Sequence, residues 1–154
     1  MTATDQTLRV INEVFTAFRA HDLGWFRALL SERAVLHNPS TGESFTGPDA
    51  IAAAVAVTLD AFPDLEPQVT NLFAAGERGV AEVMRVATHT GPLRLPGGPV
   101  PPTGRRVRMA ECVVFEVRGG KVETMSVYVD RMSVLSQLGL GPPSPEPGAA
   151  PDRA

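Results

Sequence analysis

The chain has 154 residues, of which 44% are hydrophobic, and a formal net charge of −3. That length and composition suit one soluble domain with a sizeable core. The charge is mild and the arginines are scattered, so we expect no nucleic-acid partner. No apolar run approaches the ~20 residues of a membrane span, and residues 1–7 lack an apolar signal region. We therefore expect a cytoplasmic protein with no membrane partner.

Cysteine and histidine are too sparse for a metal site or a disulfide framework. Cys112 is the single cysteine, and the three histidines are far apart in the sequence. We expect no metal ligation. Because Cys112 lies within an apolar strand pattern, we predict a buried structural thiol.

The first sixty residues are predicted to be mostly helical. Apolar residues recur at helical spacing over residues 8–20, with Thr4 or Asp5 as a candidate N-cap. The other elements predicted in this part are a helix at 23–30, a short strand at 34–37, a turn at 38–42 and a helix from Pro48 to about residue 62.

Beyond residue 67 the apolar period changes from helical to two, which indicates strands. Short glycine-containing turns at 76–78 and 119–120 predict hairpins. The connection 91–104 is rich in proline and glycine, which predicts an irregular loop. The remaining predictions are strands at 68–75, 79–90, 105–117 and 121–130, a short helix at 132–138 and a disordered tail at 141–154.

This order of elements predicts one domain, residues 1–140, of the α+β class. Three N-terminal helices would pack on a strongly curved antiparallel sheet. A curved sheet with helices across its open side makes a cone-shaped α+β barrel that encloses a pocket for a small molecule.

Four short segments carry a resemblance to a known family. They are Ala-His-Asp-Leu at 20–23; His-Asn-Pro at 37–39 with Phe-Thr-Gly at 45–47; Ala-Thr-His-Thr-Gly at 87–91 with Pro-Thr-Gly-Arg at 102–105; and the run from Gly120 through Asp130 to Gly139. In this order and spacing, the chain resembles the SnoaL-like polyketide cyclases of the nuclear-transport-factor-2-like superfamily. The resemblance covers nearly everything from the first helix to Gly139.

The resemblance implies a cofactor-free intramolecular aldol closure of a polyketide ester, with Asp130 as the acid/base residue. Two departures from the family pattern concern the site. Ser126 stands where many relatives carry Trp, and Phe115 where some carry His. Ketosteroid isomerases of the superfamily use an Asp where this chain has Asn38, and an amide cannot act as a base, so that activity is not expected.

The carboxylate of Asp130 has two interpretations. Its strand row also contains Thr124, Ser126 and Tyr128, because side chains alternate along a strand. If this polar row lines the pocket, Asp130 transfers a proton and Tyr128 hydrogen-bonds a developing enolate. Alternatively, Asp130 caps the helix that follows and Tyr128 is an amphipathic wall residue.

Further candidates carry similar pairs of interpretations. His89 either transfers a proton or anchors the loop that follows. His37 and Asn38 either orient a substrate carbonyl or satisfy a turn. Arg85 and Glu111 have matching parity on adjacent predicted strands; if buried they pair with each other, or one of them faces substrate.

Trp25 is predicted to lie in the core or to line the pocket. Met109, Val113 and Val127 are predicted on an outward apolar sheet face that a second copy covers, which makes a homodimer.

The sequence as a whole favours a polyketide-cyclase-like enzyme that acts on a small hydrophobic, polyketide-like substrate without a cofactor. One alternative is an epoxide hydrolase or epoxide-opening cyclase of the same fold. Another is a binding protein without turnover, because fold alone does not choose among these.

Overall fold

A computed structural model describes residues 1–141, so the predicted disordered tail lies, from residue 142 on, outside the described residues. The elements in chain order are α1 Ala3–Arg19, α2 Leu23–Ala28, β1 Leu30–Asn38, β2 Glu43–Thr46, α3 Pro48–Ala61, β3 Glu66–Ala75, β4 Arg78–Thr88, β5 Leu93–Leu95, β6 Gly98–Val100, β7 Arg106–Arg118, β8 Lys121–Val129 and α4 Arg131–Gln137.

Helix α1 begins at Ala3, and its N-cap is Thr2, two residues before Thr4, the first of the two predicted caps. The Thr2 hydroxyl accepts from the backbone N–H of Asp5, and the Asp5 carboxylate accepts from the N–H of Thr2 at 2.9 Å. This capping box satisfies two backbone donors of the first turn. The predicted cap at Thr4 or Asp5 is therefore wrong, although Asp5 is one of the two capping side chains.

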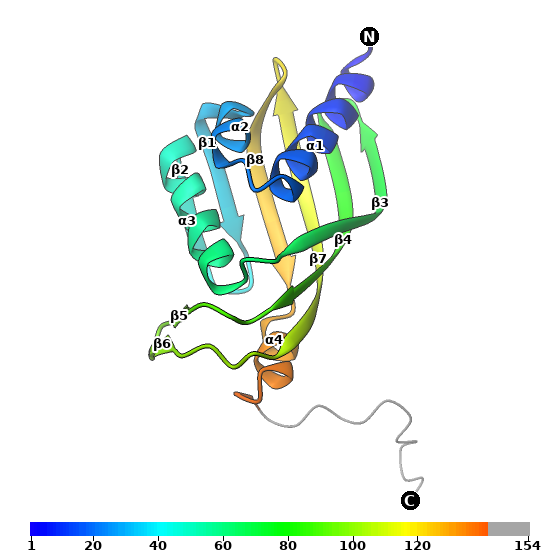
Figure 1. Ribbon diagram of the computed structural model, residues 1–154. Helices are drawn as coiled ribbons and strands as arrows, with labels where there is room; N and C mark the ends of the chain where they lie inside the picture. Colours follow the sequence, from blue (N-terminus) through cyan, green and yellow to red (C-terminus); the bar gives the residue numbers. More distant parts are fainter. Residues whose placement is uncertain (142–154) are drawn as a thin grey trace, which may run out of the picture.

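Six strands form one curved sheet in the order β2-β1-β8-β7-β4-β3 (Figure 1). The two predicted hairpins are confirmed, because β3 pairs with β4 and β7 with β8 in antiparallel fashion. The four long strands are antiparallel as predicted, and β1, which the sequence did not place in the sheet, runs parallel to β8. The sheet is open at its edge strands β2 and β3, so the cone is not a closed barrel.

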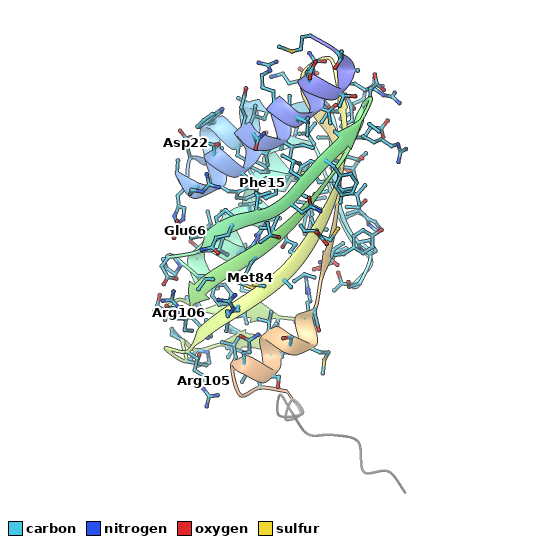
Figure 2. The ribbon with its side chains drawn as sticks, turned by 90° about the vertical axis from the view of Figure 1, so that its right-hand side faces the viewer. Phe15, Asp22, Glu66, Met84, Arg105 and Arg106 are labelled. Atoms are coloured by element: carbon cyan, nitrogen blue, oxygen red, sulfur yellow. The ribbon has the colours of Figure 1, made fainter. Side chains whose placement is uncertain are left out.

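The three helices α1, α2 and α3 cover one face of this sheet, called here the inner face (Figure 1). Figure 2, seen from the side of β3, shows α1 on that face and α4 at one end of the strands. The loop predicted at 91–104 contains a small two-stranded hairpin, β5 and β6, whose first strand packs against α3.

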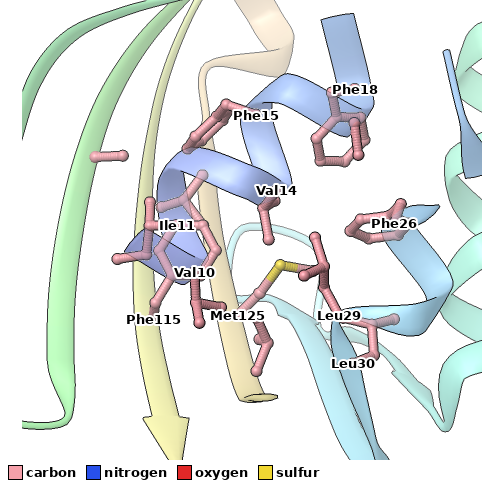
Figure 3. Packing of buried hydrophobic residues seen from close by; sticks show 14 of the residues in the cluster. Val10, Ile11, Val14, Phe15, Phe18, Phe26, Leu29, Leu30, Phe115 and Met125 are labelled. Atoms are coloured by element: carbon pink, nitrogen blue, oxygen red, sulfur yellow. The ribbon is translucent and has the colours of Figure 1, made fainter. Parts of the chain in front are cut away.

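Two clusters of buried apolar side chains fill the inner face. The first joins α1 and α2 to the sheet, with Phe15 packed edge-on to Phe115 at 6.0 Å between ring centroids (Figure 3). The second joins the end of α3 to α4, and its members are Ala61, Phe62, Leu65, Ala87, Val107, Met109 and Leu138. Leu59 packs against both.

The opposite, outer face of the sheet differs from the prediction. Met109 and Val113 belong to the buried clusters and Val127 packs against the first of them, so these residues do not form an outward apolar face. Cys112, predicted to be buried, is half-buried on the outer face. The prediction placed Met109, Val113 and Val127 on the outer face. They lie instead on the inner face, which the helices cover.

Candidate active site

A largely buried ion pair lies where the two apolar clusters meet. Arg85 on β4 donates from Nη2 to Oε1 of Glu111 on β7 at 2.7 Å, and their side chains are 14% and 6% exposed. Along β4, Val83 belongs to the first cluster and Ala87 to the second; along β7, Val113 and Met109 are divided in the same way. The predicted pairing of Arg85 with Glu111 is confirmed.

The strand register explains how the two side chains meet. Arg85 lies directly opposite Met109, and Glu111 is two residues further along the same face of β7. Diagonal neighbours of this kind are within reach of long side chains. Both residues point to the inner face because side chains alternate along a strand, and Arg85 has the parity of buried Val83 and Ala87, as Glu111 has that of Met109 and Val113.

The guanidinium of Arg85 is held by an aromatic ring as well as by the carboxylate. Its Cζ lies 5.3 Å from the centroid of the Phe18 ring on α1, a cation–π distance. Its Nε is buried and has no hydrogen-bond partner among residues 1–141. A buried N–H without an acceptor is costly and calls for an explanation.

Solvent reaches part of the inner face beside this pair. Leu36 on β1, Leu59 on α3 and Val127 and Val129 on β8 are only partly buried, and Val129 is directly opposite Glu111. Among these residues Val129, directly opposite Glu111, gives the pair an apolar neighbour that is only partly buried.

His89 anchors the loop that follows β4, which is one of the two roles that the sequence suggested for it. Its Nδ1 accepts from the backbone N–H of Thr103 at 3.2 Å and contacts the Thr103 hydroxyl at 2.9 Å. Because Nδ1 is an acceptor, the neutral ring carries its proton on Nε2. That nitrogen is buried and has no hydrogen-bond partner within residues 1–141, and the ring packs on Phe62.

His37 and Asn38 satisfy the turn between β1 and β2. Nδ1 of His37 is 2.8 Å from the Ser44 hydroxyl, and Oδ1 of Asn38 accepts from the N–H of Ser40 at 3.1 Å. Asn38 is buried. These bonds tie both side chains to the turn, as the second of the two interpretations predicts.

Asp130 is the N-cap of α4. Its carboxylate accepts from the backbone N–H of Ser133 at 3.0 Å, and the residue is exposed. Tyr128 and Ser126 lie opposite Cys112 and Val114 and face outward, since the inner face holds Met125 and Val127. The prediction that this polar row lines the inner pocket is wrong.

Phe115 and Trp25, the remaining residues predicted to contact substrate, differ in burial. Phe115 is 1% exposed and belongs to the first apolar cluster. Trp25, expected in the core or the pocket lining, is 38% exposed on α2, whereas its neighbour Phe26 is fully buried.

Two grooves lie on the outer face. One, of about 410 Å³, is lined by residues that include Thr70, Glu82, Met84, Cys112 and Tyr128. The other, of about 380 Å³, lies toward α4 and is lined by residues that include Glu66 and Arg106 (Figure 2). Within residues 1–141, no group of three or more His, Cys, Asp or Glu side chains could hold a metal ion.

Sequence reasoning missed two residues that shape this region. Phe18 is a member of the first apolar cluster, and its ring also faces Arg85. Gln137 had no predicted role, yet its side chain binds both backbone groups of Arg108 at 2.8 and 2.9 Å. The pairing of β8 with β7 reaches only Glu111, so Gln137 takes the place of a missing strand.

The fold and the Arg85–Glu111 pair together define a class of protein. Its members are small α+β proteins with a curved sheet that carries polar groups on the face beneath its helices. The chain matches the SnoaL-like polyketide cyclase family over residues 6–138. It therefore belongs to that family. A search of curated proteins gives no match.

Solved structures have the same fold. A SnoaL-like polyketide cyclase candidate from Jannaschia sp. CCS1 is 23% identical, with a TM-score of 0.81 over 92% of this chain and 97% of that one. IdmH from Streptomyces antibioticus, described as a candidate polyketide cyclase, is 27% identical, with a TM-score of 0.72 over 85% and 96%. An LEH-like epoxide hydrolase from M. tuberculosis is 19% identical, with a TM-score of 0.68 over 90% and 92%.

No helix within residues 1–141 is both long enough and apolar enough to cross a membrane.

Proposed function

We propose that this protein is a cofactor-independent cyclase that binds a small, hydrophobic, polyketide-like substrate at the inner face and closes a ring by an aldol reaction. One observation carries the proposal: the Arg85–Glu111 pair is buried at the meeting point of two apolar clusters. Glu111 is the only buried carboxylate among residues 1–141. Membership of the SnoaL-like family supports the same class of reaction.

In this proposal Glu111 removes a proton from a carbon next to a carbonyl group. The electron pair moves onto the carbonyl oxygen, and the N–H groups of Arg85 stabilise the resulting enolate. The enolate carbon then bonds to a second carbonyl carbon of the same molecule, and Glu111 returns the proton to the new alkoxide. The net charge of pair and substrate stays zero throughout, which is favourable in an apolar environment.

Asp130 is the rival acid/base residue, as the family resemblance implies. Its carboxylate is exposed and already accepts from Ser133. Glu111 has the buried position and the cationic partner that proton transfer and enolate stabilisation require, so it is the residue we favour.

Paired amide variants test the assignment. Glu111→Gln and Asp130→Asn are assayed with poly-β-ketone substrates beside the wild type. We expect Glu111→Gln to lower kcat by about 10²–10⁴-fold, the usual range for a lost acid/base group. We expect Asp130→Asn to keep kcat within a few-fold, because Asn is an equally good N-cap. Full activity of Glu111→Gln together with an inactive Asp130→Asn would assign the chemistry to Asp130.

The same assay separates the alternatives. Likeness to an epoxide hydrolase at 19% identity shows the fold alone. Turnover of epoxides but not of poly-β-ketones would replace the aldol proposal by epoxide opening. Ligand binding without turnover of either substrate class would favour a binding protein.

A further inference from the structure

One of the two grooves on the outer face has walls of opposite charge. It is the groove of about 380 Å³ toward α4, called here the charged groove, and its volume suits a small molecule. Asp64 and Glu66, just before and at the start of β3, form its acidic wall. Arg106 and Arg108, at the start of β7, form its basic wall (Figure 2). The other lining residues are Gln68, Val86 and Gln137.

Strand β4 holds the two walls apart. Glu66 is paired with Val86 on β4, and Val86 is paired in turn with Arg108 on β7. Glu66 and Arg108 are therefore in one row across the sheet, with their backbones roughly 10 Å apart. Among residues 1–141, neither Arg106 nor Arg108 makes an ion pair. The charges of the two walls face one another across the groove without closing it.

Glu66 and Arg108 are the charges that remain available to a ligand. The Asp64 carboxylate is occupied by two hydrogen bonds from Thr88, which hold its pKa low, and the charge of Arg106 adds a smaller effect. The side chains of Glu66 and Arg108 are exposed, and neither makes a hydrogen bond within residues 1–141, since Gln137 binds only the backbone of Arg108.

We propose that the charged groove binds a small zwitterion, a molecule of the amino-acid type with an ammonium group at one end and a carboxylate at the other. The ammonium group donates to Glu66 and the carboxylate accepts from Arg108, both through charge-assisted hydrogen bonds. The hydrocarbon part of the molecule lies on Val86, between the walls. A molecule with only one of these charges engages only one wall. The site is on the outer face, so it holds or fails independently of the proposed reaction.

Three probes with the same hydrocarbon chain test the inference: 6-aminohexanoate, hexanoate and hexylamine. Their dissociation constants are measured at pH 7 and low ionic strength by nuclear magnetic resonance titration, followed at the backbone amides of Val86 and Arg108. We expect the zwitterion to bind more tightly than either singly charged probe by about fivefold or more. The factor is modest because exposed charge contacts are individually weak. Added salt should reduce it.

Variants assign the preference to the two walls. Glu66→Gln should abolish the preference for 6-aminohexanoate over hexanoate, and Arg108→Gln the preference over hexylamine. Both side chains are exposed, so both variants should fold. Glu82→Gln is the matched control, because Glu82 lines the other groove of the outer face and bonds Asn71. It should keep the wild-type preference.

Three results would overturn the inference: wild-type protein that binds none of the probes, wild-type protein that binds the zwitterion no more tightly than a singly charged probe, or a Glu66→Gln variant with an unchanged preference. Absence of binding together with a change in sedimentation of Glu66→Gln would assign the groove to a contact between copies of the chain, and would also overturn it. Selective zwitterion binding by a protein inactive on poly-β-ketones would uphold this inference and reject the proposed reaction.

Discussion

Single residues determine how the β5–β6 hairpin is attached to the rest of the molecule. Gly91, at its root, donates from its backbone N–H to the carbonyl of Ala61 at the end of α3, at 3.1 Å. A Cβ atom at this position would lie 1.7 Å from the backbone oxygen of Asp60. The chain can therefore pass this close to α3 only with glycine.

We expect Gly91→Ala to destabilise the fold by about 1–3 kcal/mol, the usual cost of overpacking. Chemical denaturation measures the change. Gly97→Ala is the control, because a Cβ there meets nothing within 4 Å. Equal unfolding free energies of the two variants would show that the backbone at residue 91 moves away from α3 without loss of stability.

Asp64 links the segment after α3 to the end of β4. Its carboxylate accepts from the backbone N–H and from the hydroxyl of Thr88, each at 2.7 Å. These two hydrogen bonds hold the pKa of Asp64 below its ordinary value of 3.8, and the bond from the backbone N–H has the larger effect. A lowered pKa in the folded state means that the ionised carboxylate contributes stability above the unfolded pKa.

This contribution should be lost as the pH falls through the folded pKa. We expect the difference in unfolding free energy between wild type and Asp64→Ala to be largest near neutral pH and to shrink below about pH 4. Denaturation midpoints at a series of pH values measure it. A difference that stays constant or grows on acidification would contradict the assignment.

At the scale of elements, one side chain of α4 makes the two hydrogen bonds to β7 that the backbone of a neighbouring strand would make. Gln137 accepts from the N–H of Arg108 and donates to its carbonyl, while Leu138 is buried in the second apolar cluster. Loss of these bonds should free the end of β7 without unfolding the sheet.

We expect Gln137→Ala to speed amide hydrogen exchange at Arg108, and Gln137→Glu to do so less, because Glu keeps the acceptor and loses only the donor. Nuclear magnetic resonance measures the exchange rates, with the amide of Val113 in the centre of β7 as the internal control. Unchanged exchange at Arg108 in Gln137→Ala would show that α4 is held by Leu138 alone.

The sequence predicted most helices and strands, but not always which face of the sheet a row of side chains occupies. Alternation along β8 correctly separated Tyr128 from Met125, but one strand's pattern does not reveal which row the helices bury. One of the two interpretations of Asp130 placed this polar row inside the pocket. On β4 and β7, by contrast, Arg85 and Glu111 interrupt long apolar rows, so their pairing on the inner face was predictable.

Two topological features had no usable signal in the sequence. Near its start, after Leu30, strand β1 contains the polar segment Ser31, Glu32 and Arg33, so only its last part resembled a strand. Its parallel pairing with β8 joins residues about ninety positions apart, as in Leu36 with Met125. The short β5–β6 hairpin lies in a proline- and glycine-rich segment that predicted irregular structure.

For the whole molecule, the outer face is the surface that we propose for a homodimer. Its apolar residues are not those predicted from the sequence. Tyr128 is 48% exposed there, beside the groove that includes Met84 and Cys112. Self-association would cover this groove and leave the inner face free.

We expect the wild-type protein to sediment as a dimer and Tyr128→Asp to shift it toward monomer. Analytical ultracentrifugation measures both. Val57→Asp is the control, because Val57 is 39% exposed on α3, on the other side of the sheet. A monomeric wild type, or a dimer unaffected by Tyr128→Asp, would show that the outer face is not a dimer interface.

The central claim is that a buried carboxylate beside an arginine removes a proton next to a carbonyl group. The most direct test is deuterium incorporation, in heavy water, at the carbon next to the carbonyl of a naphthyl methyl ketone that cannot cyclise. We predict that wild type and Asp130→Asn accelerate this exchange and that Glu111→Gln does not. Exchange by Glu111→Gln at the wild-type rate would contradict the claim.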